Sequence, residues 1–185
     1  MPSRLPLHLA VLLTALYLAA PVAAEDVYLA PDAFLDSVFS GSPPRAETIW
    51  LTGARREAAA RILNRRPAAL RVRYWRDGPR TAWILEEIGK TLPITAGFVV
   101  EEGPEGGELA RLDVLIYRES HGWEVRHDFF TEQFERARLT EKLALTRAVD
   151  GISGATLSVS AMKAMAQLAL YLHGEVMTEA GERTR

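Results

Sequence analysis

The chain has 185 residues, of which 48% are hydrophobic and 25% charged, and it contains no cysteine. This length suits a single domain with a sizeable core, and the absence of cysteine excludes disulfides, thiol nucleophiles, iron–sulfur clusters and cysteine-ligated zinc. The 22 basic and 24 acidic residues give a formal net charge of −2, so the composition gives no support to generic nucleic-acid binding.

The first 24 residues have the pattern of a secretory signal peptide. Arg4 precedes an apolar stretch at residues 7–20, and Val22-Ala23-Ala24 supplies small residues before a cleavage point. The stretch is short for a bilayer span, although a single Arg also leaves an uncleaved N-terminal anchor open. We expect cleavage after residue 24, and export to the periplasm if the source has two membranes.

Residues 25–90 combine helix patterns with a hairpin pattern. Strong helix formers precede Pro67, and two alternating apolar segments flank Asp77-Gly78, a dipeptide typical of a tight turn. The expected elements are helices at 31–39 and 55–64, and strands at 49–51, 70–75 and 81–88.

Two further strands and a helical last third are expected in the rest of the chain. The expected elements are strands at 95–100 and 109–117, a glycine-rich loop at 101–108, helical segments at 129–134 and 139–149, and a long helix at 157–173. Residues 174–185 lose the apolar pattern and are expected to form a flexible tail. The sequence therefore predicts a single α+β domain with a mostly antiparallel sheet, flanking helices and a long C-terminal helix.

Several familiar sites are excluded by spacing. Gly89-Lys90-Thr91 has Ile84 where a phosphate loop needs glycine. His121 and His127 lie six residues apart, which is not a metal-ligand spacing, and His173 stands at a helix end, so we expect no metal. No G-x-G-x-x-G pattern follows a predicted strand, which argues against direct nicotinamide oxidation.

Residues 150–156, just before the long helix, contain two glycines and two hydroxyl side chains. Such a segment can hold an anion, because glycine allows close approach and a helix N-terminus offers free N–H groups. The alternative is an ordinary helix cap, in which Ser153, Thr156 or Ser158 bonds those N–H groups. The residue types alone leave both interpretations open.

The segment Asp150-Gly151-Ile152-Ser153-Gly154-Ala155-Thr156 resembles D-x-x-[S/T]-G-A-T, the flavinylation motif of FMN-binding domains. This family includes subunits of the sodium-pumping quinone reductase and Rnf complexes, and small exported flavoproteins. Residues 119–124, after a predicted strand, resemble its second element, and Phe130 with Gln133-Phe134 resembles its third. The resemblance covers residues 95–169, so we expect the core of the domain at 91–173.

The resemblance implies a site and a partner. Thr156 would carry FMN through a phosphoester bond made by a separate periplasmic flavin transferase, and Asp150 would orient or identify the segment. The other expected cofactor-binding residues are Ser153, Gly154, Ala155, Leu157, Glu119, Ser120, Gly122 and Trp123. His121 and Trp123 replace the family's Pro and Leu, and Glu135 stands where Gly often follows.

Four side chains are candidates for contact with the flavin ring. Trp123 and Tyr117 could stack on the ring or could simply pack in the core. Glu119 could accept a hydrogen bond from a ring N–H or could be a solvated strand end near Arg118. Lys90 could lie over the ring edge and favour reduced flavin.

These features together predict an exported electron carrier rather than a stand-alone enzyme. FMN would supply the redox chemistry, and a membrane-bound oxidoreductase would be the redox partner. Two alternatives remain: FMN bound without a covalent link at the same loop, and a flavin-free periplasmic binding or assembly module.

Overall fold

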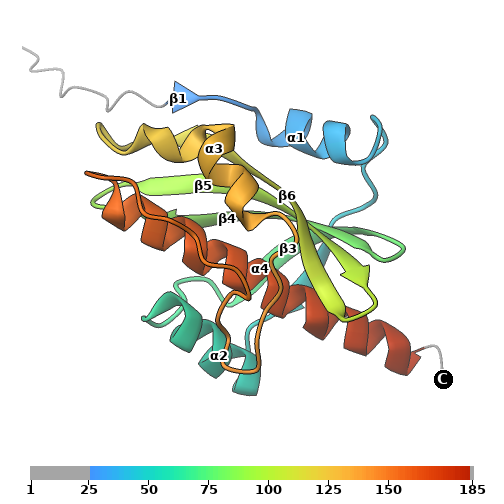
Figure 1. Cartoon of the computed structure of the whole chain (residues 1–185). Coiled ribbons are helices and arrows are strands. Elements are labelled where there is room, and N and C mark those ends of the chain that lie inside the picture. Colours follow the sequence, from blue (N-terminus) through green and yellow to red (C-terminus); the bar gives the residue numbers. More distant parts are fainter. Residues whose placement is uncertain (1–25, 184–185) are drawn as a thin grey trace, which may run out of the picture.

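The computed structural model describes residues 26–183, so the predicted signal peptide lies outside the described residues. It confirms the α+β prediction, with one antiparallel sheet in the order β1-β6-β5-β4-β3-β2 (Figure 1). The strands are β1 (Asp26–Val27), β2 (Glu47–Trp50), β3 (Arg71–Asp77), β4 (Arg80–Ile88), β5 (Pro93–Gly103) and β6 (Gly106–Tyr117).

Helices cover the two faces of the sheet unequally (Figure 1). The long helix α4 (Thr156–Arg183) lies along one face and α2 (Gly53–Leu63) packs beside it, whereas α1 (Pro31–Val38) covers part of the other. Successive side chains of β4 point to opposite faces of the sheet, so Trp83 belongs to the core under α4 and Ala82 to the core under α1.

The chain from β6 to α4 is mostly irregular. Three short helices come first: η1 (Trp123–Arg126), α3 (Asp128–Thr131) and η2 (Glu132–Phe134), and the last two confirm the helical prediction at 129–134. The helix predicted at 139–149 is wrong. The Thr140 hydroxyl accepts a hydrogen bond from the Ala144 N–H, and Leu139 pairs with Leu145, so these residues close a loop instead.

The loop predicted at 101–108 is also wrong, because β5 and β6 continue through it. Gly103 pairs with Gly106, which reduces the turn to Pro104 and Glu105. Gly106 has φ +99°, and a Cβ on Gly107 would collide with the His173 ring. The glycines that suggested a loop therefore serve a tight turn and a close contact with α4.

The expected flexible tail after His173 is likewise wrong, since α4 continues to Arg183. Val176 is buried, and the Arg55 side chain of α2 forms ion pairs with Glu175 and Glu179. These contacts come from a distant part of the chain, so the local apolar pattern does not reveal them. Within residues 26–183, no helix has the length and apolarity that a bilayer crossing requires.

Candidate cofactor site at the start of helix α4

The predicted attachment residue is the first residue of α4. Before it, Gly154 has φ +82° and open space around it, and the N–H of the buried Ala155 donates to the Ile152 carbonyl (3.0 Å). Thr156 and Leu157 follow, and both are exposed. The turn thus places the Thr156 hydroxyl at the surface, in the first turn of a 28-residue helix.

The capping interpretation is not supported. Within residues 26–183, the hydroxyls of Ser153 and Thr156 make no hydrogen bond, and the buried Ser158 hydroxyl bonds to the Tyr117 hydroxyl (2.9 Å). None of the three candidate hydroxyls caps α4. The N–H groups of its first turn are therefore available to an anion, as an uncapped helix N-terminus allows.

The loop at residues 119–123 packs directly against this turn. The Tyr117 hydroxyl lies 2.5 Å from the His121 carbonyl oxygen and 2.9 Å from Ser158 Oγ. Gly122 has φ +87°, and a Cβ there would lie 2.8 Å from both hydroxyl oxygens. The structure therefore brings the first two elements of the family pattern into contact, and a side chain at position 122 would separate them.

The contact between Ser158 and Tyr117 was not predicted from the sequence. Ser158 was considered only as a cap, yet it is a buried hydroxyl in the apolar stripe of α4, beside Val159 and Met162. A serine in that position needs a polar partner inside the protein. The Tyr117 hydroxyl is that partner.

The two aromatic candidates for ring stacking are in different environments. Tyr117 is only 1% exposed, so it packs in the core, and burial raises the pKa of its hydroxyl against the opposing effect of the Ser158 hydrogen bond. Trp123 is 42% exposed, and its ring lies edge-on to His127 at 5.4 Å, with the Arg126 guanidinium 5.1 Å from its centre. Stacking on a ligand stays a prediction for Trp123 alone.

Glu119 has a role that neither sequence-based alternative included. Its carboxylate accepts hydrogen bonds from the N–H groups of Lys90 (2.5 Å), Thr91 (2.5 Å) and Leu92 (2.8 Å). Burial acts to raise the pKa of Glu119, but these hydrogen bonds outweigh it and lower the pKa. Glu119 thus fixes the turn between β4 and β5 in its ionised form.

The neighbours of Glu119 are exposed. The side chains of Lys90 and Ser120 both face solvent. The backbone N–H of Lys90 is bonded to the Glu119 carboxylate, whereas its ammonium group forms no ion pair within residues 26–183. A contact between Lys90 or Ser120 and the flavin stays a prediction.

The third element of the family pattern holds the start of the predicted attachment segment, residues 150–156. Gln133 accepts a hydrogen bond from the Asp150 N–H through Oε1 (2.7 Å) and donates from Nε2 to the Phe129 carbonyl (3.1 Å). Phe130 and Phe134 anchor the same helices in the core. Gln133 therefore fixes the backbone at Asp150 and leaves the Asp150 carboxylate exposed.

These residues fit a phosphate ester of FMN. Thr156 offers a free hydroxyl, the first turn of α4 offers uncapped N–H groups, and Gly154 leaves space beside them. The exposed Trp123 lies one residue from Gly122, which touches this turn. The donor set is thus suited to a singly charged phosphodiester and a nearby aromatic ring.

Comparison with known proteins gives one match. Residues 89–171 match the family model of the FMN-binding domain. No curated protein and no solved structure matches the chain. The matched residues include the turn held by Glu119, the Gln133 contact and Thr156, whereas α1, β2, α2 and β3 precede them.

Proposed function

Because residues 89–171 of this chain belong to the FMN-binding domain family, whose cofactor is FMN, we propose that the protein is an exported electron-transfer flavoprotein with FMN bound covalently to Thr156. The observation that carries the proposal is the exposed Thr156 hydroxyl, which has no hydrogen-bond partner within residues 26–183. It stands at the uncapped start of α4, beside the left-handed Gly154.

Attachment needs a second protein. A threonine hydroxyl is a weak nucleophile at neutral pH, and no side chain within residues 26–183 bonds to the Thr156 hydroxyl to act as its base. A flavin transferase would remove the hydroxyl proton as an O–P bond forms, while the phosphate of an activated flavin nucleotide loses its leaving group. The exposed Asp150 carboxylate would serve as a recognition point for that enzyme.

The chain's own groups would then hold the product. The phosphodiester keeps one negative charge, which the first-turn N–H groups and the dipole of α4 favour. Gly122 keeps the 119–123 loop against this turn, and Trp123 offers an exposed ring beside it. FMN supplies one- and two-electron chemistry when bound, and the protein would position it to exchange electrons with a membrane-bound oxidoreductase.

The proposal is tested by making the full chain with and without a flavin transferase and measuring its intact mass. The wild type is expected to gain the mass of FMN less one water and to keep its fluorescence after denaturation. Thr156→Ala is expected to lose both signals. Ser160→Ala, which removes an exposed hydroxyl one turn later, is expected to behave as wild type.

Other outcomes would contradict the proposal. A yellow protein that releases its flavin on denaturation would show non-covalent binding at the same loop. A colourless protein, made alongside an active transferase, would support a flavin-free binding or assembly module. Retention of the mass increase in Thr156→Ala would place the attachment at another residue.

A further inference from the structure

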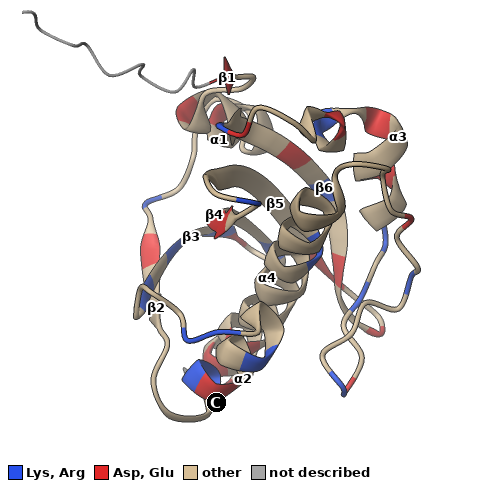
Figure 2. Cartoon of the chain, turned by 90° about the vertical axis from the view of Figure 1, so that its left-hand side faces the viewer, with Lys and Arg blue, Asp and Glu red and all other residues tan. Residues whose placement is uncertain are grey.

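Charge is unevenly distributed along the chain. The whole chain carries a net charge of −2, yet residues 53–80 contain nine arginines and only two acidic residues. These residues form α2, the loop after it, β3 and the start of β4, and basic residues mark α2 and β3 in Figure 2. This region lies before the part of the chain that matches the FMN-binding domain.

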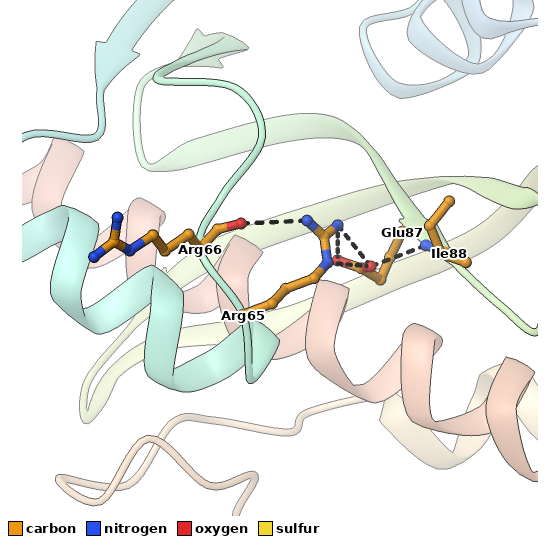
Figure 3. A network of polar contacts seen from close by, with 4 residues as sticks. All are labelled: Arg65, Arg66, Glu87 and Ile88. Carbon is orange, nitrogen blue, oxygen red and sulfur yellow. Dashed lines mark hydrogen bonds and ion pairs between the residues drawn. The ribbon is translucent and has the colours of Figure 1, made fainter.

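Part of this positive charge is neutralised inside the protein. Arg65 forms a forked ion pair with Glu87, from Nη2 to Oε1 (2.7 Å) and Oε2 (2.9 Å) (Figure 3). Arg65 also donates to the Arg66 carbonyl (3.4 Å). Because the Glu87 side chain is buried, this pair fixes the loop after α2 against the end of β4.

Two exposed arginines of β3 have no acidic partner in the part of the chain that the structure describes. Arg71 and Arg73 are exposed and form no ion pair within residues 26–183. The Arg73 guanidinium lies 5.9 Å from the centre of the Trp75 ring. Their charges are therefore available to a partner.

These arginines lie on a part of the sheet face that α1 leaves uncovered. Trp50 is directly opposite Arg71 in the pairing of β2 with β3, so both side chains point to the same face. Trp50 is 54% exposed, and Ile88, on the same face of β4, is 46% exposed. Large apolar side chains next to unpaired arginines are typical of protein interfaces.

The same face is hollowed. A groove of about 740 Å³, which we call the arginine groove, opens on it, and its lining also includes side chains of the core under α4, such as Leu85 and Leu168. Its lining includes Arg65, Arg71, Arg73, Trp75, Ile84 and Ile88. The groove has three acidic lining residues, and two of them already have basic neighbours: Glu87 is paired with Arg65, and Glu86 lies 3.6 Å from Arg118. Asp32 is therefore the one acidic lining residue whose charge is left to offset those of Arg71 and Arg73.

We propose that the arginine groove is a docking site for an acidic segment of a partner protein. Guanidinium groups bind carboxylates through two parallel hydrogen bonds, and the apolar walls suit the side chains between the carboxylates. The concave shape fits a protruding segment better than a flat anionic bilayer. Charge complementarity and shape therefore point to the same occupant.

The groove also lies close to the proposed flavin site. Its lining includes Ile88 and Pro93, which flank the turn that Glu119 holds. A partner seated there would be next to the loop that packs against the start of α4. This step rests on the proposed function: if the protein carries electrons through FMN, the partner that docks in the arginine groove is its redox partner.

The probe for the test is a fluorescein-labelled peptide of alternating glutamate and leucine, titrated into flavin-loaded protein while anisotropy is measured. Arg71→Gln with Arg73→Gln is expected to weaken binding at least tenfold, and added salt should weaken binding to the wild type. The charge-matched control, Arg136→Gln with Lys142→Gln, changes two exposed cations elsewhere and is expected to alter affinity less than twofold. Thr156→Ala protein should bind the peptide as wild type does, which separates a failure of docking from a failure of flavin attachment.

Three results would overturn the inference. Equal weakening in both double variants would show non-specific charge attraction, and unchanged binding in the Arg71 and Arg73 variant would place the peptide elsewhere. Binding to phosphatidylglycerol vesicles with no binding to the peptide would identify a membrane surface instead. Ile88→Ala, which removes an exposed apolar side chain of the groove and leaves every charge in place, is expected to weaken binding about threefold, and unchanged affinity would contradict the apolar part of the site.

Discussion

The two ends of α4 differ in how their polar groups are satisfied. At the N-terminal end Thr156 is exposed and its hydroxyl has no partner within residues 26–183. Towards the C-terminal end His173 is completely buried, with Nδ1 2.8 Å from Thr81 Oγ1 and Nε2 2.9 Å from Glu102 Oε2. One helix is thus held by internal hydrogen bonds towards one end and has a free, exposed hydroxyl at the other.

The hydrogen bonds around His173 are consistent with a neutral ring. Trp83 Nε1 donates to Thr81 Oγ1 (2.8 Å), so the Thr81 hydroxyl is free to donate to His173 Nδ1. Nε2 then carries the ring proton and donates it to Glu102. Burial lowers the pKa of His173, although Glu102 acts to raise it.

The largest effect on stability is expected at this buried end. His173→Ala should lower the free energy of unfolding by about 3 kcal/mol, because it opens a cavity and leaves Thr81 and Glu102 without their partner. Urea unfolding measures the change, and flavin loading of the folded variant should be unaffected. Thr178→Ala, on the exposed side of α4, is the control.

The same variant has a pH signature. Because the folded-state pKa of His173 lies below its ordinary value of 6.5, the unfolded chain takes up a proton first as pH falls, and wild-type stability decreases below that pH. His173→Ala should lose this part of the pH dependence. A stability loss below about 1 kcal/mol, or an unchanged pH profile, would contradict the role of His173.

Gly122→Ala is expected to have the next largest effect, now at the ligand end. The alanine would have to keep a backbone φ of +87°, and its methyl group would lie 2.8 Å from the Tyr117 and Ser158 hydroxyl oxygens. We therefore expect the free energy of unfolding to fall by about 2 kcal/mol and flavin loading to decrease. Intact mass gives the loading, and thermal unfolding gives the stability. Gly181→Ala, which has open space around it, should change neither, and full loading of Gly122→Ala would show that attachment tolerates separation of the 119–123 loop from α4.

Glu119→Gln is expected to cost about 1 kcal/mol at neutral pH, because an amide cannot accept the three N–H bonds as well as a carboxylate does. Since the pKa of Glu119 is lowered in the folded protein, its contribution is present above about pH 4.5 and is lost as pH falls further. Urea unfolding between pH 3 and pH 7 should therefore show a flatter acid dependence for the variant. Identical curves for variant and wild type would mean that the turn does not depend on this carboxylate.

The smallest effect on stability is expected from Trp123→Ala, below about 0.5 kcal/mol, because the side chain is partly exposed. Its effect should appear in the flavin instead, as a shift of the visible absorbance bands. Trp50→Ala removes an exposed tryptophan from the opposite face of the sheet and is the matched control. An unchanged spectrum in Trp123→Ala would assign Trp123 to surface packing alone.

Local patterns predicted the elements that local interactions determine. The hairpin around Asp77-Gly78, the helices α1 and α2 and the start of α4 all follow from spacing and turn residues. The attachment segment was predicted differently, from the resemblance of seven consecutive residues to a family motif, because the residue types alone left a helix cap open. Two of the three wrong predictions depend on distant contacts: Arg55 supports the last turns of α4, and the His173 ring requires the glycine at position 107. The third, the helix at 139–149, was wrong for a local reason, because the Thr140 hydroxyl accepts a hydrogen bond from the Ala144 N–H and closes a loop.

The site shows the same division. The glycines and hydroxyls before α4 can be read from the sequence, but the bond between Tyr117 and Ser158 joins segments whose contact only the folded chain creates. Glu119 was expected to face the flavin or solvent, and the turn that takes up its carboxylate lies almost thirty residues earlier in the chain. Sequence spacing carries no information on such a pairing.

The proposed attachment of FMN to Thr156 is tested most directly on one peptide of wild-type protein made with a flavin transferase. Trypsin cleaves after Arg147 and Lys163, which releases residues 148–163 with Ser153, Thr156, Ser158 and Ser160 as the four hydroxyl candidates. Fragmentation in a tandem mass spectrometer should place the mass of FMN less one water on Thr156. The same mass on any of the three serines, or a peptide without it, would contradict the account.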